Sequence, residues 1–421
     1  MPLNPWITLF SFLTIILPLL NPFVAFAVNP QGEALLSWKQ SLNGPTEALS
    51  NWNPTHETPC EWLGITCNKK KEVVELELSP KRDCYTAELN YLDLSGNALT
   101  GEIPSEICNL LKLQEIHLNS NQLEGSIPVQ IGNLTSLKRL TLFENQLNGE
   151  IPNTIGNLKN LQVLRAGRNK NLGGLIPREI WNCTELTMLG LTHTSVLGFL
   201  PPSLGLLKKL ETIYIGSSLL SGQIPPEIGN CTALQNIYLH ENSLTGSIPK
   251  SLENLKSLRN LDLWKNSLVG TIPSELGNCK ELSIPLAISK CQNLEALDLS
   301  ENFLTGNIPQ GIFQFKKLKT LYLFSNNLSG EIPKEIGNLE NLHNLDLSLN
   351  RFSGNVPAEI LGCRNLTYLN LHSNLITGIF PGKLSRLVLL QNVDFSDNLI
   401  EDTNNDFRTK KMLVGSLEKW S

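Results

Sequence analysis

The 421-residue sequence is short of charge and of closely spaced histidines. Charged residues make up 17% of it and the net charge is −5, so we predict no basic surface for nucleic acid or for an acidic membrane. The six histidines are scattered, and none has the spacing of metal ligands. No Ser/His/Asp or Cys/His set can be assembled either. We therefore expect no metal, no cofactor and no catalytic residue, and a protein that is not an enzyme.

Long apolar runs are also scarce. Residues 7–20 form one apolar run, and Ala25-Phe26-Ala27 then supplies the small residues of a signal-peptide cleavage site. The run is interrupted by Pro18 and is shorter than the ~20 apolar residues that a membrane span needs. We predict a signal peptide over residues 1–27 and, since no second such run follows, a secreted chain without a membrane span.

The abundant feature is a repeat of about 24 residues, L-x-x-L-x-L-x-x-N-x-L-x-G-x-I-P. Thr194 and Ser218 take the place of the asparagine in two copies, so there are about thirteen leucine-rich repeats. The other copies are marked by Asn97, Asn121, Asn145, Asn169, Asn242, Asn266, Asn302, Asn326, Asn350, Asn374 and Asn398. Stacked repeats present a long open surface instead of an enclosed pocket, which suits binding better than catalysis.

The repeat also predicts the fold. Leucines that alternate in x-x-L-x-L-x-x point inward from a short strand, and the residues between them point to solvent. Stacked copies then pair these strands into a parallel sheet on the concave face. The asparagine side chains can satisfy backbone groups left unpaired at the turn, and should form a buried ladder. The expected fold is an α/β solenoid, a leucine-rich-repeat superhelix with an N-terminal cap.

The boundaries of the segments follow from where the repeat begins and fails. Residues 28–72 are predicted to be the cap, in which Cys60 and Cys67 form a disulfide in an oxidising compartment. The repeats cover residues 73–400. Half a copy, including its strand, is missing near residues 279–291, where we expect a kink or local disorder. Residues 401–421 are polar and are predicted to be an irregular, poorly ordered tail without a capping lid.

Other cysteines recur at one repeat position where most copies carry leucine. They are best interpreted as small buried apolar residues, and they are Cys183, Cys231, Cys279, Cys291 and Cys363. Cys84 and Cys108 have no obvious partner. Sequons for N-glycosylation begin at Asn133, Asn182, Asn230, Asn327 and Asn365, and three of them are predicted to lie on the outer side of the solenoid.

The middle copies carry unusual residues at positions that should project from the concave face. Aromatic residues and arginine often dominate binding energy, and these candidates are Arg165, Gly167, Arg168, His193, Tyr214, Tyr238, His240, Asp262 and Trp264. At ~4.8 Å per strand, six copies span about 25–30 Å, enough for roughly eight residues of extended peptide. The alternative is that exposed strand positions simply vary.

The L-x-G-x-I-P repeat, together with W-x-G-x-x-C in the cap, resembles the extracellular part of plant leucine-rich-repeat receptor-like kinases over residues 30–400. Residues 161–172 are similar to the receptors for root meristem growth factor peptides, whose Arg-x-Gly-Gly motif receives a sulfated tyrosine. Arg165 and Gly167 match that motif, and Arg168 replaces its last glycine, where it either blocks the pocket or adds to anion binding. No Arg-x-Arg pair for a ligand carboxylate and no kinase motif is found.

The resemblance implies an extracellular region that binds a secreted peptide hormone, tyrosine-sulfated in that receptor group, on its concave face. It also implies a leucine-rich-repeat co-receptor, and a plasma-membrane location if a fuller gene product carries a transmembrane helix. As written, the chain would be a truncated or decoy form. Two alternatives are kept: a secreted enzyme inhibitor similar to the plant inhibitors of fungal polygalacturonases, and a non-functional truncated product.

Overall fold

The computed structural model describes residues 36, 51–62, 65–67, 69, 71, 73–76, 90–96, 99–103, 105–277, 293–378, 384–400 and 411–413. Statements about the fold concern these residues. The predicted signal peptide, Asn97, Cys84, Cys279 and Cys291 lie outside them.

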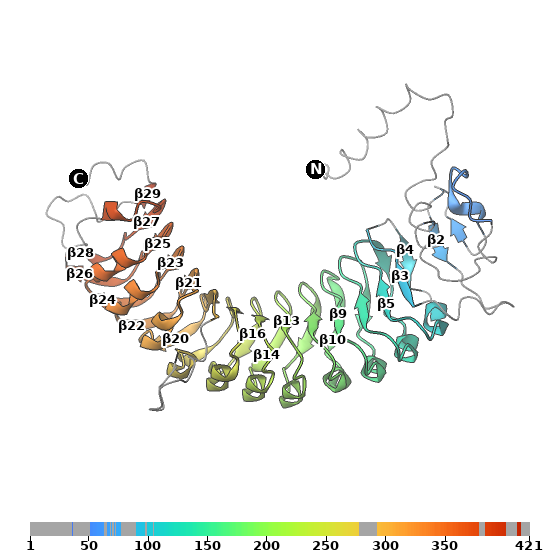
Figure 1. Ribbon diagram of the computed structural model, residues 1–421, viewed down its shortest axis with the longest axis horizontal. Helices are drawn as coiled ribbons and strands as arrows, with labels where there is room; N and C mark the ends of the chain where they lie inside the picture. The colour runs from blue at the N-terminus through green and yellow to red at the C-terminus, as the bar shows by residue number, and fades with distance from the viewer. Residues whose placement is uncertain are drawn as a thin grey trace, which may run out of the picture.

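The repeats form an open arc whose concave side carries one continuous sheet (Figure 1). Thirteen three-residue strands, one from each predicted copy, pair side by side in parallel and in sequence order. They are β3 (Tyr91–Asp93), β5 (Glu115–His117), β7 (Arg139–Thr141), β9 (Val163–Arg165), β11 (Met188–Gly190), β13 (Thr212–Tyr214), β15 (Asn236–Tyr238), β17 (Asn260–Asp262), β19 (Ala296–Asp298), β21 (Thr320–Tyr322), β23 (Asn344–Asp346), β25 (Tyr368–Asn370) and β27 (Asn392–Asp394). The predicted parallel sheet is confirmed.

Burial alternates along each strand as the sequence pattern predicts. In β13, Ile213 is fully buried while both of its neighbours are partly exposed. Ile213 stands in register with Leu189 before it and Ile237 after it, so the leucine positions stack into one continuous core. Each such side chain contributes about 1.5–3 kcal/mol on burial, which is why the repeats are stable only when stacked.

The predicted asparagine ladder is present. Asn145 donates from Nδ2 to the carbonyl of Leu142 in its own copy at 3.1 Å and to that of Leu118 in the preceding copy at 2.9 Å. Its Oδ1 accepts the backbone N–H of Leu123 at 3.0 Å. The same contacts recur from copy to copy, so each asparagine ties two neighbouring turns together through buried backbone groups.

The ladder is altered where Thr194 and Ser218 replace asparagine, although Ser218 Oγ still donates to the carbonyl of Leu191 in the preceding copy at 3.2 Å. Thr194 Oγ1 donates to the carbonyl of Leu191, in its own copy, at 2.7 Å, and no bond reaches from it to the backbone of the preceding copy. The N–H of Leu172, which an asparagine side chain would accept, instead donates to the Asn169 carbonyl at 3.0 Å. Among the described junctions, only the one between the Asn169 copy and the Thr194 copy therefore lacks the side-chain bridge.

The L-x-G-x-I-P segment builds two further layers. Its first half forms a second set of parallel strands on the flank of the arc, which the sequence analysis did not predict. They are β4 (Thr100–Glu102), β6 (Gln122–Glu124), β8 (Asn148–Glu150), β10 (Asn171–Leu175), β12 (Ser195–Gly198), β14 (Leu219–Gln223), β16 (Ser243–Thr245), β18 (Val269–Thr271), β20 (Phe303–Gly306), β22 (Asn327–Glu331), β24 (Arg351–Gly354), β26 (Leu375–Gly378) and β28 (Leu399–Ile400). We refer to these strands as the flank strands.

After the flank strands, short 3₁₀ helices line the outer curve (Figure 1). Most begin directly after the proline, whose fixed φ favours entry into a helical turn. They are η4 (Ser105–Asn109), η5 (Val129–Asn133), η6 (Asn153–Asn157), η7 (Arg178–Asn182), η8 (Pro202–Leu206), η9 (Pro226–Asn230), η10 (Lys250–Asn254), η11 (Ser274–Gly277), η12 (Gln310–Gln314), η13 (Lys334–Asn338), η14 (Ala358–Gly362) and η15 (Leu384–Arg386). The expected solenoid is thus confirmed, with 3₁₀ turns as its helical element.

The cap contains η2 (Pro59–Glu61) and an antiparallel pair, β1 (Ile65–Cys67) and β2 (Val73–Leu76). Cys60 and Cys67 are joined by the predicted disulfide. Trp52 and Trp62 are buried and stack with ring centroids 5.3 Å apart, and they belong to the same core cluster as the first repeats. The cap thereby covers the open end of the core, as a solenoid requires.

The shortened copy does not interrupt the concave sheet. Asn260, Leu261 and Asp262 of β17 pair directly with residues 296–298 of β19 in the register of the other copies. The strand ladder therefore continues across the shortened copy in unchanged register, because the missing half-copy took its own strand with it. Residues 278–292, where the half-copy is missing, lie outside the described part.

The prediction of an irregular tail is wrong for three residues. β29 (Lys411–Leu413) pairs antiparallel with β27, Val393 standing opposite Met412. The last strand of an array leaves a row of unpaired N–H and C=O groups, and a returning segment can satisfy them. Residues 401–410 and 414–421 lie outside the described part.

The predicted burial of the recurring cysteines is confirmed where it can be seen. Cys183, Cys231 and Cys363 are free and buried, and Cys108 is buried too. Burial raises the pKa of the Cys231 thiol to about 11, so it stays protonated and unreactive near neutral pH. Cys183, Cys231 and Cys363 fill core positions that carry leucine in other copies.

Candidate ligand-binding surface

The solvent-facing positions of the concave strands form two columns in the middle of the arc. The third residue of each strand stands beside its counterpart in the next copy, with neighbouring strands about 4.8 Å apart. This first column runs Arg165, Gly190, Tyr214, Tyr238, Asp262 and Asp298. The second column lies two residues further along each copy and runs Phe143, Gly167, Thr192, Gly216, His240 and Trp264.

Two arginines at the start of this block behave differently. Arg165 lies over the ring of Phe143, with Cζ 4.0 Å from the ring centroid, and no carboxylate in the described part of the chain pairs with it. Arg168 donates from Nη1 to Glu144 Oε1 at 2.7 Å. Its backbone has φ = +54°, the left-handed region in which glycine is most easily accommodated. Arg168 is therefore committed to an ion pair, and Arg165 is the available cation.

Beside Arg165 several positions of the concave face carry glycine. At Gly167 a Cβ atom would lie 2.8 Å from the Thr192 carbonyl oxygen, so only glycine fits. Gly216 is covered by the ring of His240, which occupies the space where a side chain would begin. We call Gly167, Gly190 and Gly216 the glycine stretch. These three residues, themselves buried, add no side chain between Arg165 and the aromatic rings.

The aromatic rings form a continuous cluster across three copies. Ring centroids are 5.1 Å apart for Tyr214 and Tyr238, 5.8 Å for Tyr214 and His240, and 6.2 Å for His240 and Trp264. The ring of Trp264 is held by a hydrogen bond from Nε1 to Glu301 at 3.1 Å. Fixed, partly exposed rings of this kind are suited to anchor a ligand with little loss of side-chain entropy.

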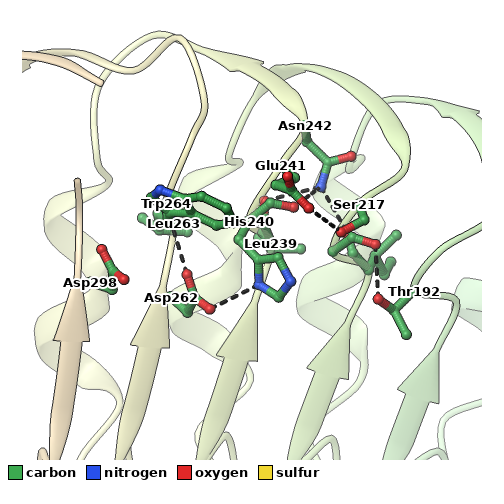
Figure 2. Close-up of polar contacts among 12 residues, drawn as sticks. Thr192, Ser217, Leu239, His240, Glu241, Asn242, Asp262, Leu263, Trp264 and Asp298 are labelled. Carbon is green, nitrogen blue, oxygen red and sulfur yellow. Dashed lines mark hydrogen bonds and ion pairs between the residues drawn. The ribbon is translucent and has the colours of Figure 1, made fainter. Parts of the chain in front are cut away.

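A polar pair fixes the centre of this cluster. His240 Nδ1 lies 2.8 Å from Asp262 Oδ2, and the two side chains are only 14% and 27% exposed (Figure 2). The hydrogen bond to Asp262 raises the pKa of His240 above its ordinary value. The backbone N–H of Trp264 donates to the other oxygen of Asp262 at 3.2 Å. His240 thus holds its position over Gly216 and favours its charged form.

Asp298 stands next to Asp262 on the neighbouring strand (Figure 2). Burial, with a further contribution from the charge of Asp262, raises the pKa of Asp298 to about 6. The N–H of Ser300 donates to its Oδ1 at 3.0 Å and lowers that pKa less than burial raises it. The end of the block nearest β19 therefore carries a carboxyl group that gains a proton at mildly acidic pH.

Two matching polar chains line the edge of the concave face. In the first, Glu144 binds Ser120 at 2.8 Å and Arg168 at 2.7 Å. In the second, Glu241 binds Ser217 at 2.5 Å and Lys265 at 2.9 Å. His193 lies at the corresponding position between them, is exposed, and contacts Thr192 Oγ1 through Nδ1 at 2.9 Å.

The structure therefore gathers five of the predicted residues, Tyr214, Tyr238, His240, Asp262 and Trp264, into one cluster. It places Arg165 beside Gly190 of the glycine stretch, to which Gly167 also belongs, and Arg168 and His193 at the edge. Sequence analysis missed Glu144, Glu241 and Asp298. Their spacing of one copy from a basic or acidic partner was the signal that could have revealed them.

The sequons lie away from this block. Asn133, Asn182 and Asn230 are exposed at the ends of η5, η7 and η9 on the outer curve. Asn327 is exposed at the start of β22, and Asn365 is half-buried and donates to the Glu340 carbonyl at 3.0 Å. Among the described residues there is no group of three potential metal ligands. No helix in that part is both long and apolar enough to span a bilayer.

Two family models match the chain. A leucine rich repeat N-terminal domain matches residues 28–68. The leucine rich repeat matches nine segments, at residues 88–110, 112–134, 136–158, 233–255, 257–279, 293–315, 317–339, 341–363 and 365–387. The unmatched interval between residues 158 and 233 contains Thr194 and Ser218, where the ladder asparagine is replaced.

Among Arabidopsis thaliana proteins, the leucine-rich repeat receptor-like serine/threonine-protein kinase RGI4 is 40% identical over 140 residues, which is 25% of this chain and 13% of the relative. The receptor-like kinase RGI3 is 42% identical over 91 residues, 20% of this chain and 8% of the relative. The chain thus aligns with only a small part of these relatives.

Solved structures match over a larger share. The plant peptide hormone receptor RGFR1 in complex with RGF2 is 45% identical, with a TM-score of 0.71 over 81% of this chain and 57% of that one. The Arabidopsis receptor kinase HAESA, in complex with the peptide hormone IDA and the co-receptor SERK1, is 33% identical, with a TM-score of 0.65 over 89% of this chain and 66% of that one. A leucine-rich-repeat protein of Leptospira interrogans is 33% identical, with a TM-score of 0.58 over 75% of this chain and 74% of that one. The chain therefore belongs to the leucine-rich-repeat proteins and is homologous to the plant leucine-rich-repeat receptor kinases.

Proposed function

We propose that the concave face of this chain binds a secreted peptide hormone in an extended conformation, and that the chain acts by binding and not by catalysis. The observation that carries the proposal is the arrangement in one block of an available cation, glycines without side chains and fixed aromatic rings. Two homologous ectodomains of known structure, RGFR1 and HAESA, are in complex with peptide hormones. This supports the same use of the surface here.

The proposed contact for a sulfated tyrosine is Arg165. Its guanidinium is stacked on Phe143, an arrangement that leaves its N–H groups free to donate to an anion. Charge-assisted bonds from arginine to an anionic oxygen are among the stronger polar contacts. Arg168 is a poorer candidate, because an anion would have to displace Glu144 from it. The proposal therefore assigns the anion to Arg165 and a structural role to Arg168.

The glycine stretch and the aromatic cluster then receive the rest of the peptide. Gly167 and Gly190 have no side chain that would hold a ligand away from the sheet, and Tyr214 and Trp264 supply apolar contact beyond them. Spanning β9 to β17 requires about 20 Å, or six extended residues. This length fits a short peptide better than a folded protein domain.

The proposed location is extracellular. The Cys60–Cys67 disulfide is typical of an oxidising compartment, and the exposed sequons of the outer curve would leave the concave face free of glycans. A leucine-rich-repeat co-receptor, by analogy with SERK1 in the HAESA complex, is part of this proposal. The decoy form and the inhibitor function stay predictions.

The test is calorimetric titration of the purified chain with RGF2, synthesised with and without sulfate on its tyrosine. Arg165→Ala should lower the affinity for the sulfated peptide by about 10- to 100-fold, because a hydrogen bond to a charged group contributes about 1.5–3 kcal/mol. The unsulfated peptide should be affected little. Arg168→Ala is the matched control and should change either affinity by less than about threefold. An equal loss of affinity for both peptides, or no loss for either, would show that Arg165 does not bind the sulfate.

A further inference from the structure

The flank strands present a second ordered surface, distinct from the concave face. In each copy, the residue after L-x-G lays its side chain over the glycine of the next copy, which has positive φ and no Cβ. We call these residues the flank column: Glu102, Ser126, Glu150, Leu175, Phe199, Gln223, Ser247, Thr271, Asn307, Glu331 and Asn355. Because the glycines leave room, side chains of this column lie flat on the sheet and face solvent.

Two of the eleven residues of the flank column are apolar, and they are adjacent. Leu175 is 60% exposed and lies over Gly198, and Phe199 is 64% exposed and lies over Gly222. The other nine are polar, which shows that the fold does not require an apolar residue at this place. Leu175 and Phe199 thus expose apolar area without a structural reason.

The neighbouring strands enlarge this exposed area. Leu197 of β12 pairs in register with Leu175 of β10 and with Leu219 of β14. Leu197 is 40% exposed and Leu219 is 56% exposed. With Phe199 they form one patch, which we call the leucine patch. Its exposed apolar area is on the order of a few hundred Å², the size at which such patches on monomers often mark interaction sites.

An acidic strip borders the leucine patch on its N-terminal side. Glu102, Glu124 and Glu150 end β4, β6 and β8, and all three are exposed. Glu102 and Glu124 stand side by side in register. Within the described residues none of the three has an ion-pair partner, whereas Glu144 and Glu241 each hold a basic residue. The strip therefore presents uncompensated negative charge next to apolar surface.

We propose that the leucine patch and its acidic strip form a docking surface for a second protein, whose contact face has an apolar centre bordered on one side by lysine or arginine. Protein interfaces combine an apolar core with a polar rim, and complementary charge fixes their orientation. A standard interface buries about 800 Å² per partner, so the patch would be its core and the glutamates part of its rim.

Charge argues against a second copy of this chain as the occupant. The flank column contains no lysine or arginine, so the same face of a second copy would leave the three glutamates without cations. None of the five sequon asparagines belongs to the leucine patch or to the acidic strip. No residue of the proposed docking surface would therefore carry an N-linked glycan. The proposal concerns a different face from the peptide site and does not depend on the proposed function.

The experiment uses two synthetic amphipathic helical peptides as probes. Both carry the same leucine and phenylalanine stripe, bordered by lysines in one and by glutamates in the other, and binding is followed by fluorescence anisotropy. Leu175→Ser with Phe199→Gln introduces residues that the flank column already carries at Ser126 and Gln223. The matched control is Val269→Thr with Phe303→Ser, a second exposed apolar pair in register on β18 and β20. Thermal melts verify that both variants fold.

The lysine-bordered probe should bind at least about tenfold more tightly than the glutamate-bordered one. Leu175→Ser/Phe199→Gln should remove that binding and the control variant should keep it. Replacing Glu102, Glu124 and Glu150 by glutamine, or raising the ionic strength from about 0.05 to about 0.5 M, should weaken it several-fold. Equal binding of both probes, or binding that survives Leu175→Ser/Phe199→Gln, would overturn the proposal. So would sedimentation showing self-association of the chain that the same variant abolishes.

Discussion

The asparagine ladder makes Asn326→Ala a sharp test of how the solenoid is held together. Asn326 is 8% exposed, and its Oδ1 accepts the Leu304 N–H at 3.0 Å. Its Nδ2 donates to the carbonyls of Leu299 and Leu323 at 3.0 and 3.1 Å. The substitution would remove all of these bonds while leaving the leucine core intact.

The expected cost can be assembled from these contacts. The Leu304 N–H loses its only side-chain acceptor, and a buried unsatisfied donor costs about 1–3 kcal/mol. The two carbonyls lose less, because Asn302 also donates to Leu299 at 3.2 Å and Asn350 also donates to Leu323 at 2.9 Å. An under-satisfied carbonyl is tolerated better than an orphaned N–H. We expect a total loss of about 2–4 kcal/mol in the free energy of unfolding.

The assay is urea denaturation followed by circular dichroism and by tryptophan fluorescence. Coincident transitions would justify a single free energy, since long repeat arrays can depart from two-state behaviour. Asn341→Ala is the matched control: Asn341 is exposed and donates only to the Lys316 carbonyl, at 2.8 Å. This control substitution should change the free energy of unfolding by no more than about 0.5 kcal/mol. A loss below about 1 kcal/mol for Asn326→Ala would mean that leucine packing alone carries the stability and that the ladder is dispensable.

Three further predictions concern stability. Thr194→Asn should raise the urea midpoint by restoring the missing bridge to the preceding copy, and an unchanged or lower midpoint would show that this junction cannot accept the ladder geometry. Burial raises the pKa of Asp298 from 3.8 to about 6, so the free energy of unfolding should fall as the pH rises from about 4 to about 6, and Asp298→Asn should flatten that slope. The pKa of His240 is raised above 6.5 by Asp262, so a further fall should follow above that pH. Reducing Cys60–Cys67, or replacing both by alanine, should cost about 2.5 kcal/mol of cap stability in the chain-entropy model for so short a loop, measured by hydrogen exchange of β1 and β2; unaltered exchange would contradict it.

Much of the fold could be predicted because the spacing of residues within the repeat determines the geometry of each copy. A leucine at every second strand position and an asparagine at each turn define an inward face, a parallel neighbour and a buried polar ladder. The structure confirms the inward face and the parallel neighbours along the described copies, and the ladder at every described junction except the one that precedes Thr194. The flank strands were not predicted, because L-x-G-x-I-P carries too little apolar alternation to distinguish a strand from a turn.

The candidate site was predictable only in part. Sequence spacing placed Arg165 and Arg168 three residues apart, and both remained candidates for an anion. The structure distinguishes them, because Arg168 meets Glu144 one copy away while Arg165 meets the face of Phe143. The 24-residue period can suggest which residues lie one copy apart. Which of these neighbours a side chain contacts depends on its orientation, and residue spacing does not give that orientation.

By itself, the sequence determined that this chain is a stack of leucine-rich repeats with an open concave surface, since the period alone forces the leucines into a shared core. Only the tertiary structure decided which surface residues act together. The ring of His240 rests on the backbone of Gly216 in the preceding copy and pairs with Asp262 in the next, and Leu175 meets Leu197 and Leu219 across three flank strands. Such groups form between copies, where the packing of one turn on another sets the distances.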